Sequence, residues 1–242
     1  MGQESVNRSF PHNWNVWVGT DEAGKGDYFG SLAVAGVYVN PEICEQLRAL
    51  GVRDGKQIPD LELHKLAQEI RIGGGKYVTS AEATPLRYNT LYAAHSAKGQ
   101  NLNHLLASLH AEVIGRLIKR FNCRHVLVDR FAKPEILESQ LGALNSKILL
   151  VQLPKAERDI AVAAASLIAR DVFLKQLARL SKRYDMELPK GATRVIDAGV
   201  QFVKQHGSKA LRDVAKLHFS TTEHITARIS AETDLTKKEQ TT

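Results

Sequence analysis

Residues 14–39 read WNVWVGTDEAGKGDYFGSLAVAGVYV, and this segment decides the fold. Its first seven residues alternate between apolar and polar side chains, which predicts a β-strand over 14–20. Residues 30–39 are small and apolar, which predicts a second, buried strand. The Gly-Lys-Gly sequence at 24–26 predicts a turn between them. The segment is therefore expected to form a hairpin, and the sheet that contains it must be mixed.

Strands and helices alternate along most of the remaining chain. Strands are predicted at 76–80, 125–129 and 147–153, and helices at 41–50, 60–72, 102–118, 133–141 and 160–180. The clearest helix, 102–118, carries its leucines at helical spacing on one face. Helices that alternate with strands indicate an α/β fold with a mixed sheet flanked by helices.

Four regions are predicted from local composition. Residues 1–13 form a polar tail, 14–185 the α/β domain, 186–225 a small basic helical appendage and 226–242 a flexible polar tail. Positive charge gathers toward the carboxyl end, since residues 1–150 carry a net charge of +2 and residues 151–242 a net charge of +5. Such a charge attracts a phosphate backbone, although a solvated surface explains it equally well.

Eight basic residues are candidates for a face that binds a nucleic-acid backbone, with a solvated helical surface as the alternative. They are Lys182, Arg183, Lys190, Arg194, Lys204, Lys209, Arg212 and Lys216.

The overall composition excludes several classes of protein. The 242 residues carry a net charge of +7, and 43% of them are hydrophobic, too many for a disordered chain. Two cysteines, Cys44 and Cys123, cannot make a disulfide framework, so a reducing cytosol is the simplest compartment. No apolar run approaches the roughly 20 residues of a membrane span, and no membrane association is expected.

Four carboxylates are predicted to meet at one edge of the sheet. Asp21 and Glu22 follow the first strand, Asp129 ends the strand at 125–129, and Glu157 lies just beyond the strand at 147–153. Ligands of open α/β sheets collect at this edge. Neighbouring carboxylates repel one another, and Mg²⁺ or Mn²⁺ relieves that repulsion through oxygen ligands. Two such ions suit phosphoryl chemistry. A carboxylate at a strand end is also common as a helix cap, and Asp129 alone supports either interpretation.

The glycine-rich turn adds a second signal beside the acidic pair. Gly24 and Gly26 allow backbone N–H groups to approach a phosphate or a sugar hydroxyl, and Lys25 adds positive charge. A glycine-rich turn alone is weak evidence.

Several motifs, in this order, resemble those of the type 2 ribonucleases H. They are GTDEAGKGDYFG at 19–30, GVRDGK at 51–56, VLVDRFAKPE at 126–135, KAE at 155–157 before AVAAASLIAR at 161–170, LPKG at 188–191 and KLHF at 216–219. Lys25 and Glu157 resemble ribonuclease HIII more than ribonuclease HII. The resemblance covers about residues 14–222.

The resemblance implies a ribonuclease H-like fold and a metal-dependent endonuclease. That enzyme cleaves the RNA strand of RNA/DNA hybrids by two-metal-ion hydrolysis, leaving 3′-hydroxyl and 5′-phosphate ends. Asp21, Glu22, Asp129 and Glu157 correspond to the family's catalytic metal ligands, with Asp159 a competitor for the fourth place. Gly24, Lys25 and Gly26 correspond to the turn that senses the RNA 2′-hydroxyl, and Lys56 is expected to contact substrate.

The sequence departs from the family pattern in two places. Gly55 stands where the family has serine, which removes a hydroxyl near Lys56. Ribonucleases HIII typically carry an amino-terminal substrate-binding domain, whereas only a short segment precedes Asp21, so the domain is missing from this lineage or the chain is shortened. Hybrid affinity would then rest on the basic appendage.

Two other functions remain open at this stage. The first is incision at single ribonucleotides in DNA, as in ribonuclease HII. The second is a nucleic-acid-binding module that has lost catalysis. No obligate protein partner is implied, and a monomer is expected.

Overall fold

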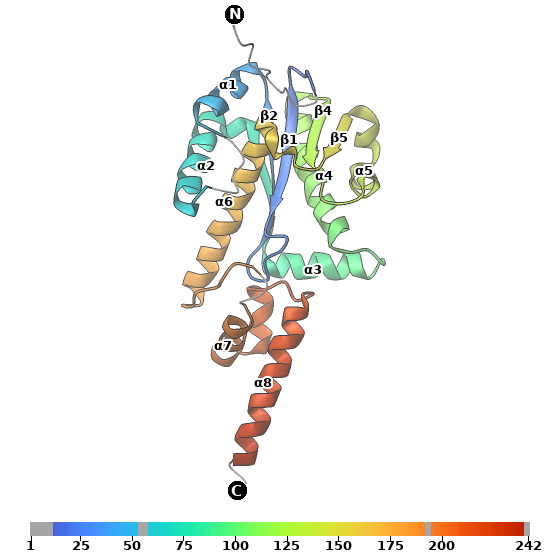
Figure 1. Ribbon diagram of the computed structural model, residues 1–242. Helices are drawn as coiled ribbons and strands as arrows, with labels where there is room; N and C mark the ends of the chain where they lie inside the picture. The colour runs from blue at the N-terminus through green and yellow to red at the C-terminus, as the bar shows by residue number, and fades with distance from the viewer. Residues whose placement is uncertain (1–11, 53–57, 192–194, 240–242) are drawn as a thin grey trace, which may run out of the picture.

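A computed structural model describes residues 12–52, 58–191 and 195–239 (Figure 1). Its five-stranded sheet has the order β3-β2-β1-β4-β5. The strands are β1 (Trp17–Ala23), β2 (Leu32–Val39), β3 (Val78–Ala83), β4 (His125–Asp129) and β5 (Leu149–Leu153). β1, β2 and β3 are antiparallel neighbours, while β4 lies parallel to β1 and β5 parallel to β4. The predicted mixed sheet that begins with a hairpin is confirmed.

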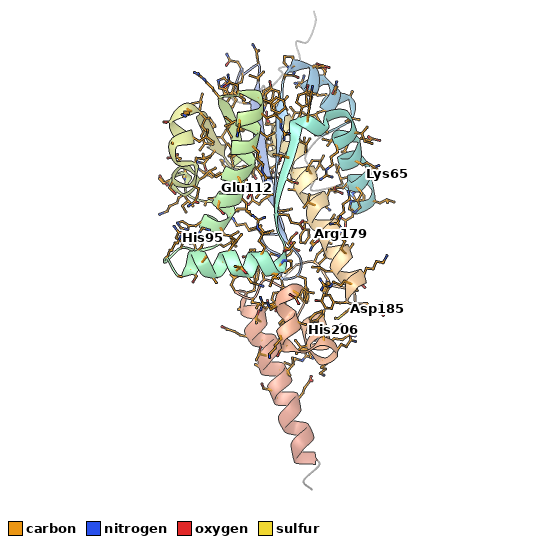
Figure 2. The ribbon with its side chains drawn as sticks, turned by 180° about the vertical axis from the view of Figure 1, so that it is seen from behind. Lys65, His95, Glu112, Arg179, Asp185 and His206 are labelled. Carbon is orange, nitrogen blue, oxygen red and sulfur yellow. The ribbon has the colours of Figure 1, made fainter. Side chains whose placement is uncertain are left out.

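Helices cover both faces of the sheet. The first face carries α1 (Pro41–Ala49), α2 (Asp60–Gly74) and α6 (Ile160–Arg183), and the second carries α4 (Leu102–Phe121) and α5 (Pro134–Leu141) (Figure 1). The two faces follow from the alternation of side chains along a strand. In β2, Ala35 and Val37 join the core under α6, whereas Leu32 and Val34 join the core under α4. Figure 2 shows Lys65 of α2 and Glu112 of α4 on the two sides.

Helix α6 lies unusually close to β1 because of a glycine. A Cβ added to Gly19 would lie 2.4 Å from the amide nitrogen of Val162 and 2.7 Å from the Cβ of Ala161. Alanines make up much of the first half of α6, and their small side chains allow the helix to approach the sheet closely. The glycine and the alanines together bring the amino-terminal turns of α6 against the middle of the sheet.

Several elements differ from the sequence prediction. β1 starts later and runs on to Ala23, because the hairpin pairing with β2 continues to the pair Ala23–Ala33. Asp21 and Glu22 therefore lie inside the strand, not after it. Helix α3 (Pro85–Ser96) was not predicted, because it buries only Pro85 and Tyr88 and so has no apolar stripe. The 3₁₀ turn η2 (Gly75–Tyr77) delays the start of β3 to residue 78.

A helical unit follows α6 and lies beyond one end of the sheet (Figure 1). It contains α7 (Ile196–His206), the 3₁₀ turn η5 (Ser208–Asp213) and α8 (Ser220–Glu239). Ile225 of α8 is fully buried and fills the space above Gly199, where a Cβ would lie 2.1 Å from it. The predicted flexible tail is thus helical as far as Glu239, because Ile225 and the ion pair between Arg228 and Asp197 attach α8 to α7.

The two cysteines lie in different cores and are free thiols. Cys44 belongs to the core under α6 and Cys123 to the core under α4. No helix in the described part of the chain is long and apolar enough to cross a membrane.

Candidate active site

The register of β1 and β4 brings two of the predicted carboxylates side by side. Thr20 pairs with Val128, and the next residue of each parallel strand is Asp21 and Asp129. Asp21 is 8% exposed and Asp129 is half-buried. The charge of Asp129 is close enough to raise the pKa of Asp21. The central pair of the predicted site is therefore assembled by the sheet itself.

Asp21 lies on the side of β1 that faces α6. Burial, followed by the charge of Glu22, raises the pKa of Asp21 to about 8, while a hydrogen bond from Ser166 of α6 acts in the opposite direction. The backbone N–H of Glu22 also donates to Asp21 Oδ1 over 2.8 Å. A buried carboxyl beside two others favours its neutral, protonated form, unless a bound cation compensates for the charge of the carboxylate.

We expect Asp21→Asn to stabilise the protein in EDTA at alkaline pH. Unfolded Asp21 loses its proton near the ordinary pKa of 3.8, whereas the folded side chain keeps its proton up to about pH 8. The folded state therefore binds the proton more tightly, and the wild-type free energy of unfolding falls as pH rises from 4 to 8. Urea unfolding at pH 8 should show the variant at least about 1 kcal/mol more stable, roughly 2–4 °C in Tm.

The gain should shrink toward zero below pH 4, where both states of the wild type are protonated. An equal gain at every pH would show that folding does not raise the pKa of Asp21.

Glu22 points to the other side of β1, where a buried histidine holds it. His110 of α4 is fully buried, with Nε2 3.3 Å from Glu22 Oε2 and Nδ1 3.0 Å from Thr20 Oγ1. An ionised carboxylate only accepts hydrogen bonds, so Nε2 carries the proton. In the neutral imidazole Nδ1 then accepts from the Thr20 hydroxyl. The ring also stacks on Phe131, with centroids 4.6 Å apart. These contacts fix the direction of the Glu22 carboxylate.

Replacing His110 with phenylalanine should lower kcat for hybrid cleavage by roughly 10–100-fold, the usual loss when a group that orients a ligand is removed. The phenyl ring keeps the stacking on Phe131 but cannot bond to Glu22 or Thr20. Single-turnover cleavage measures the effect, and His104→Ala on the same helix is the matched control. Unchanged cleavage by a folded His110→Phe variant would show that Glu22 needs no such support.

Glu157 and Asp159 have different surroundings. Glu157 lies in the 3₁₀ turn η4 (Ala156–Arg158) and is 6% exposed. Asp159 is the N-cap of α6, and its Oδ1 accepts from the backbone N–H groups of Ala161 and Val162. The same oxygen accepts from the Trp17 indole over 3.0 Å, and Oδ2 lies 3.2 Å from His12. Asp159 is thus committed to fixing the start of α6, which favours Glu157 as the fourth carboxylate.

Asp129 connects β4 to the turn that carries Glu157. Its Oδ1 accepts from the Ala156 N–H over 2.9 Å. Lys155 precedes this turn with a left-handed backbone, φ 58°. The carboxylates of the two elements are therefore held in one local structure.

The glycine-rich turn follows β1 directly. Gly24 has φ 85°, and a Cβ there would lie 2.2 Å from the Ser31 carbonyl oxygen, so only glycine fits. Gly26 faces open space. Lys25 Nζ donates to the Phe131 carbonyl over 3.1 Å and lies 4.0 Å from Glu22 Oε1. Lys56 lies outside the described residues.

Three contacts of the site were missed or undervalued in the sequence. None of His110, Ser166 and Phe131 is predicted from the sequence as a partner of the carboxylates or of Lys25. All three come from elements far from Asp21 in sequence, and no local pattern marks them.

Asp21 lies close to Glu22 and Asp129, but these carboxylates do not form a closed cage. Among the residues that the structure describes, no three His, Cys, Asp or Glu side chains are grouped as a metal would require. Backbone N–H groups and His110 engage the oxygens of Asp21, Asp129 and Glu22. The donor set is nevertheless the hard, anionic oxygen set that suits Mg²⁺ and Mn²⁺.

Most of the chain matches the model of one protein family. A family model described as Ribonuclease HII matches residues 18–222. The chain belongs to the ribonuclease HII family. Within this family the chain is similar to ribonuclease HIII of Protochlamydia amoebophila (strain UWE25), with 38% identity over 213 residues, which are 88% of this chain and 69% of the relative. Ribonuclease HIII of Chlamydia pneumoniae is 41% identical over 215 residues, 86% of this chain and 69% of the relative.

Solved structures of the ribonuclease HII family share the fold. Bst-RNase HIII, crystallised in complex with Mn²⁺, superposes with a TM-score of 0.76 at 31% identity over 88% of this chain and 70% of its own. Ribonuclease HII from Archaeoglobus fulgidus, in a complex with PCNA, gives a TM-score of 0.62 at 29% identity over 79% of this chain and 88% of the matched chain. The predicted type 2 ribonuclease H fold and its likeness to ribonuclease HIII are confirmed.

Proposed function

We propose that this protein is an endoribonuclease that cleaves the RNA strand of RNA/DNA hybrids. Membership of the ribonuclease HII family supports a ribonuclease H activity. The observation that carries the proposal is the placement of Asp21 beside Asp129 by the parallel pairing of β1 and β4, directly before the glycine-rich turn. The site thus puts acidic groups and a phosphate-approachable backbone next to each other.

Asp21, Glu22, Asp129 and Glu157 are the residues proposed to hold divalent cations. The fit rests on the chemistry of the donors and on Asp21, whose pKa is raised to about 8 by burial and by the charges of Glu22 and Asp129. Bound Mg²⁺ or Mn²⁺ would neutralise these charges and stabilise the charge that develops on the scissile phosphate. Bst-RNase HIII in its complex with Mn²⁺ supports a divalent ion here.

The remaining residues of the site have distinct tasks in this proposal. Ser166 and His110 orient Asp21 and Glu22 from opposite faces of the sheet. The backbone of Gly24 and Gly26 contacts the ribose 2′-hydroxyl, the group that distinguishes RNA from DNA. Lys25 leaves its contact with Phe131 to approach a phosphate. Hydrolysis leaves 3′-hydroxyl and 5′-phosphate ends.

Cleavage of an end-labelled RNA/DNA hybrid in Mg²⁺ and in Mn²⁺ tests the proposal, with EDTA as the control. Internal cuts in the RNA strand that depend on the metal support it. A DNA duplex with one ribonucleotide is assayed in parallel, and preferential incision there would favour the ribonuclease HII-like alternative. Salt-sensitive hybrid binding without cuts in either metal would favour a binding module.

We propose a second contact for the hybrid backbone on the basic appendage, made by some of the eight predicted basic residues. Lys182 and Arg183 are exposed at the end of α6, and Lys209 and Arg212 are exposed in the appendage itself. Lys190 and Lys204 are exposed but pair with Asp60 and Glu232. Lys216 is fully buried, so its predicted place on this face is wrong. Arg194 lies outside the described residues.

A monomer in the cytosol remains the simplest setting for this proposal. Cys44 and Cys123 are both buried free thiols, on opposite faces of the sheet, which suits a reducing compartment. The catalytic domain is proposed to span 14–185 and the appendage 186–225, with α8 continuing into the region beyond.

A further inference from the structure

Lys216 is a buried lysine that binds the loop after the glycine-rich turn. It lies between η5 and α8, and its side chain has no exposed surface. Its Nζ donates to the carbonyl oxygens of Asp27 over 2.6 Å and Gly30 over 2.9 Å, and lies 3.5 Å from that of Phe29. One ammonium group thus gathers three carbonyls from a single four-residue segment.

The backbone around Lys216 pairs with the same loop. The N–H of Lys216 donates to the Tyr28 carbonyl, and the N–H of Gly30 donates to the Val214 carbonyl, each over 2.9 Å. Phe29 and Ala215 form an isolated antiparallel bridge. The loop therefore lies against the 214–216 segment through both main chain and side chain.

Two further contacts fix the far side of the loop and of Lys216. Asp27 Oδ1 accepts from the Gly191 N–H over 2.7 Å, so its carboxylate is already engaged. On α3, Asn89 donates to the Ala215 carbonyl and accepts from the Leu217 N–H, each over 2.9 Å. The lysine is consequently locked between the loop, the appendage and α3.

Burial of this ammonium is costly for the fold. Burial lowers the pKa of Lys216 to about 7, and the charge of Asp27 offsets only part of that effect. The neighbouring His218, whose Nδ1 lies 3.3 Å from the Tyr88 hydroxyl, is held neutral beside this ammonium, since burial and then the charge of Lys216 lower its pKa to about 4. A methionine would fill the same volume without a charge, so general packing does not explain a lysine here.

We propose that Lys216 is a positioning residue that sets the shape of the Gly24–Gly26 turn from the carboxyl-terminal appendage. The first carbonyl that Lys216 binds belongs to Asp27, the residue directly after Gly26. By holding this carbonyl, Lys216 fixes the path of the chain as it leaves the turn. Lys216 touches neither substrate nor the four carboxylates and acts only through the loop. The consequence for substrate rests on the proposed function, whereas the consequence for loop order does not.

Lys216→Met tests the assignment, with Lys119→Met, at an exposed lysine of α4, as the matched control. Amide hydrogen exchange follows residues 24–31, and the ratio of hybrid to DNA-duplex affinity is measured in Ca²⁺. Steady-state cleavage then separates kcat from KM. In Lys216→Met we expect faster exchange confined to 24–31, a loss of about 10-fold in the affinity ratio and a higher KM. Lys119→Met should change neither exchange nor the ratio.

Unchanged exchange at 24–31 in a folded Lys216→Met protein would overturn the proposal, whatever the wild type cleaves. Faster exchange with an unchanged affinity ratio would overturn the substrate part alone. If wild type binds and cleaves no hybrid, the proposed function fails, and the exchange result still decides the role of Lys216 in the loop. If Lys216→Met does not fold, Lys216→Arg replaces it. In Lys216→Arg, the exchange protection of residues 24–31 and the ratio of hybrid to DNA-duplex affinity must then change in the same direction relative to wild type. A change in only one of these two quantities contradicts the assignment.

Discussion

Asp129→Asn is expected to leave a folded protein that has lost hybrid cleavage by on the order of 10³-fold or more. Asparagine has the same shape, and its amide oxygen can still accept the Ala156 N–H, so β4 and the η4 turn should keep their contact. The charge beside Asp21 is lost, and with it one of the anionic oxygens proposed to hold the divalent ion. Single-turnover assays at saturating Mg²⁺ and Mn²⁺ measure the loss.

Asp60→Asn is the matched control for this substitution. Asp60 is an exposed aspartate on α2 that pairs with Arg170 and Lys190, away from the four carboxylates. The Asp60→Asn variant should cleave the hybrid at close to the wild-type rate. Near-normal turnover by Asp129→Asn would remove Asp129 from the catalytic set, and an equal loss in both variants would indicate a general defect.

Gly19→Val should prevent stable folding or cost at least about 3 kcal/mol. A Cβ at this position would lie 2.4–2.7 Å from three atoms of α6, which are the Val162 amide nitrogen, the Ala161 carbonyl carbon and the Ala161 Cβ. The first two are backbone atoms, which no rotamer change can move. Helix α6 would have to withdraw from β1, taking Ser166 away from Asp21. Urea unfolding followed by circular dichroism measures the cost.

Gly115→Ala supplies the control for a glycine of the same protein. Gly115 lies within α4, and the nearest atom to an added Cβ is 4.0 Å away. Alanine there should be neutral or stabilising by up to about 1 kcal/mol, because it favours the helix. A folded Gly19→Val protein as stable as wild type would mean that α6 does not pack on β1 as described.

The fold was largely predictable from local patterns. The alternation in β1, the apolar run of β2 and the leucine spacing of α4 each mark their elements, because each buries one side of a regular structure. Helix α3 carries no such stripe and escaped prediction. The full length of β1 was also missed, since it depends on pairing with β2, which no local pattern records.

The candidate site was predictable only as far as its residues are contiguous with a motif. The acidic pair and the glycine turn lie in one stretch, and Asp129 ends a recognisable strand. His110, by contrast, resembles any histidine on an amphipathic helix until α4 is packed on the sheet. Likewise Lys216 looked like a surface charge among other lysines, because its burial is created by three segments that meet only in the folded chain.

The pairing of β1 with β4 has a consequence for synthesis of the chain on the ribosome. Asp21 and Asp129 are more than 100 residues apart in sequence, and the loop after the glycine turn also needs the 214–216 segment, which follows later still. A ribosome adds roughly 5–20 residues per second, so the parts of the site emerge many seconds apart. A nascent chain therefore exposes its acidic hairpin long before it has a complete site. Activity should first appear only after the 214–216 segment has left the ribosome.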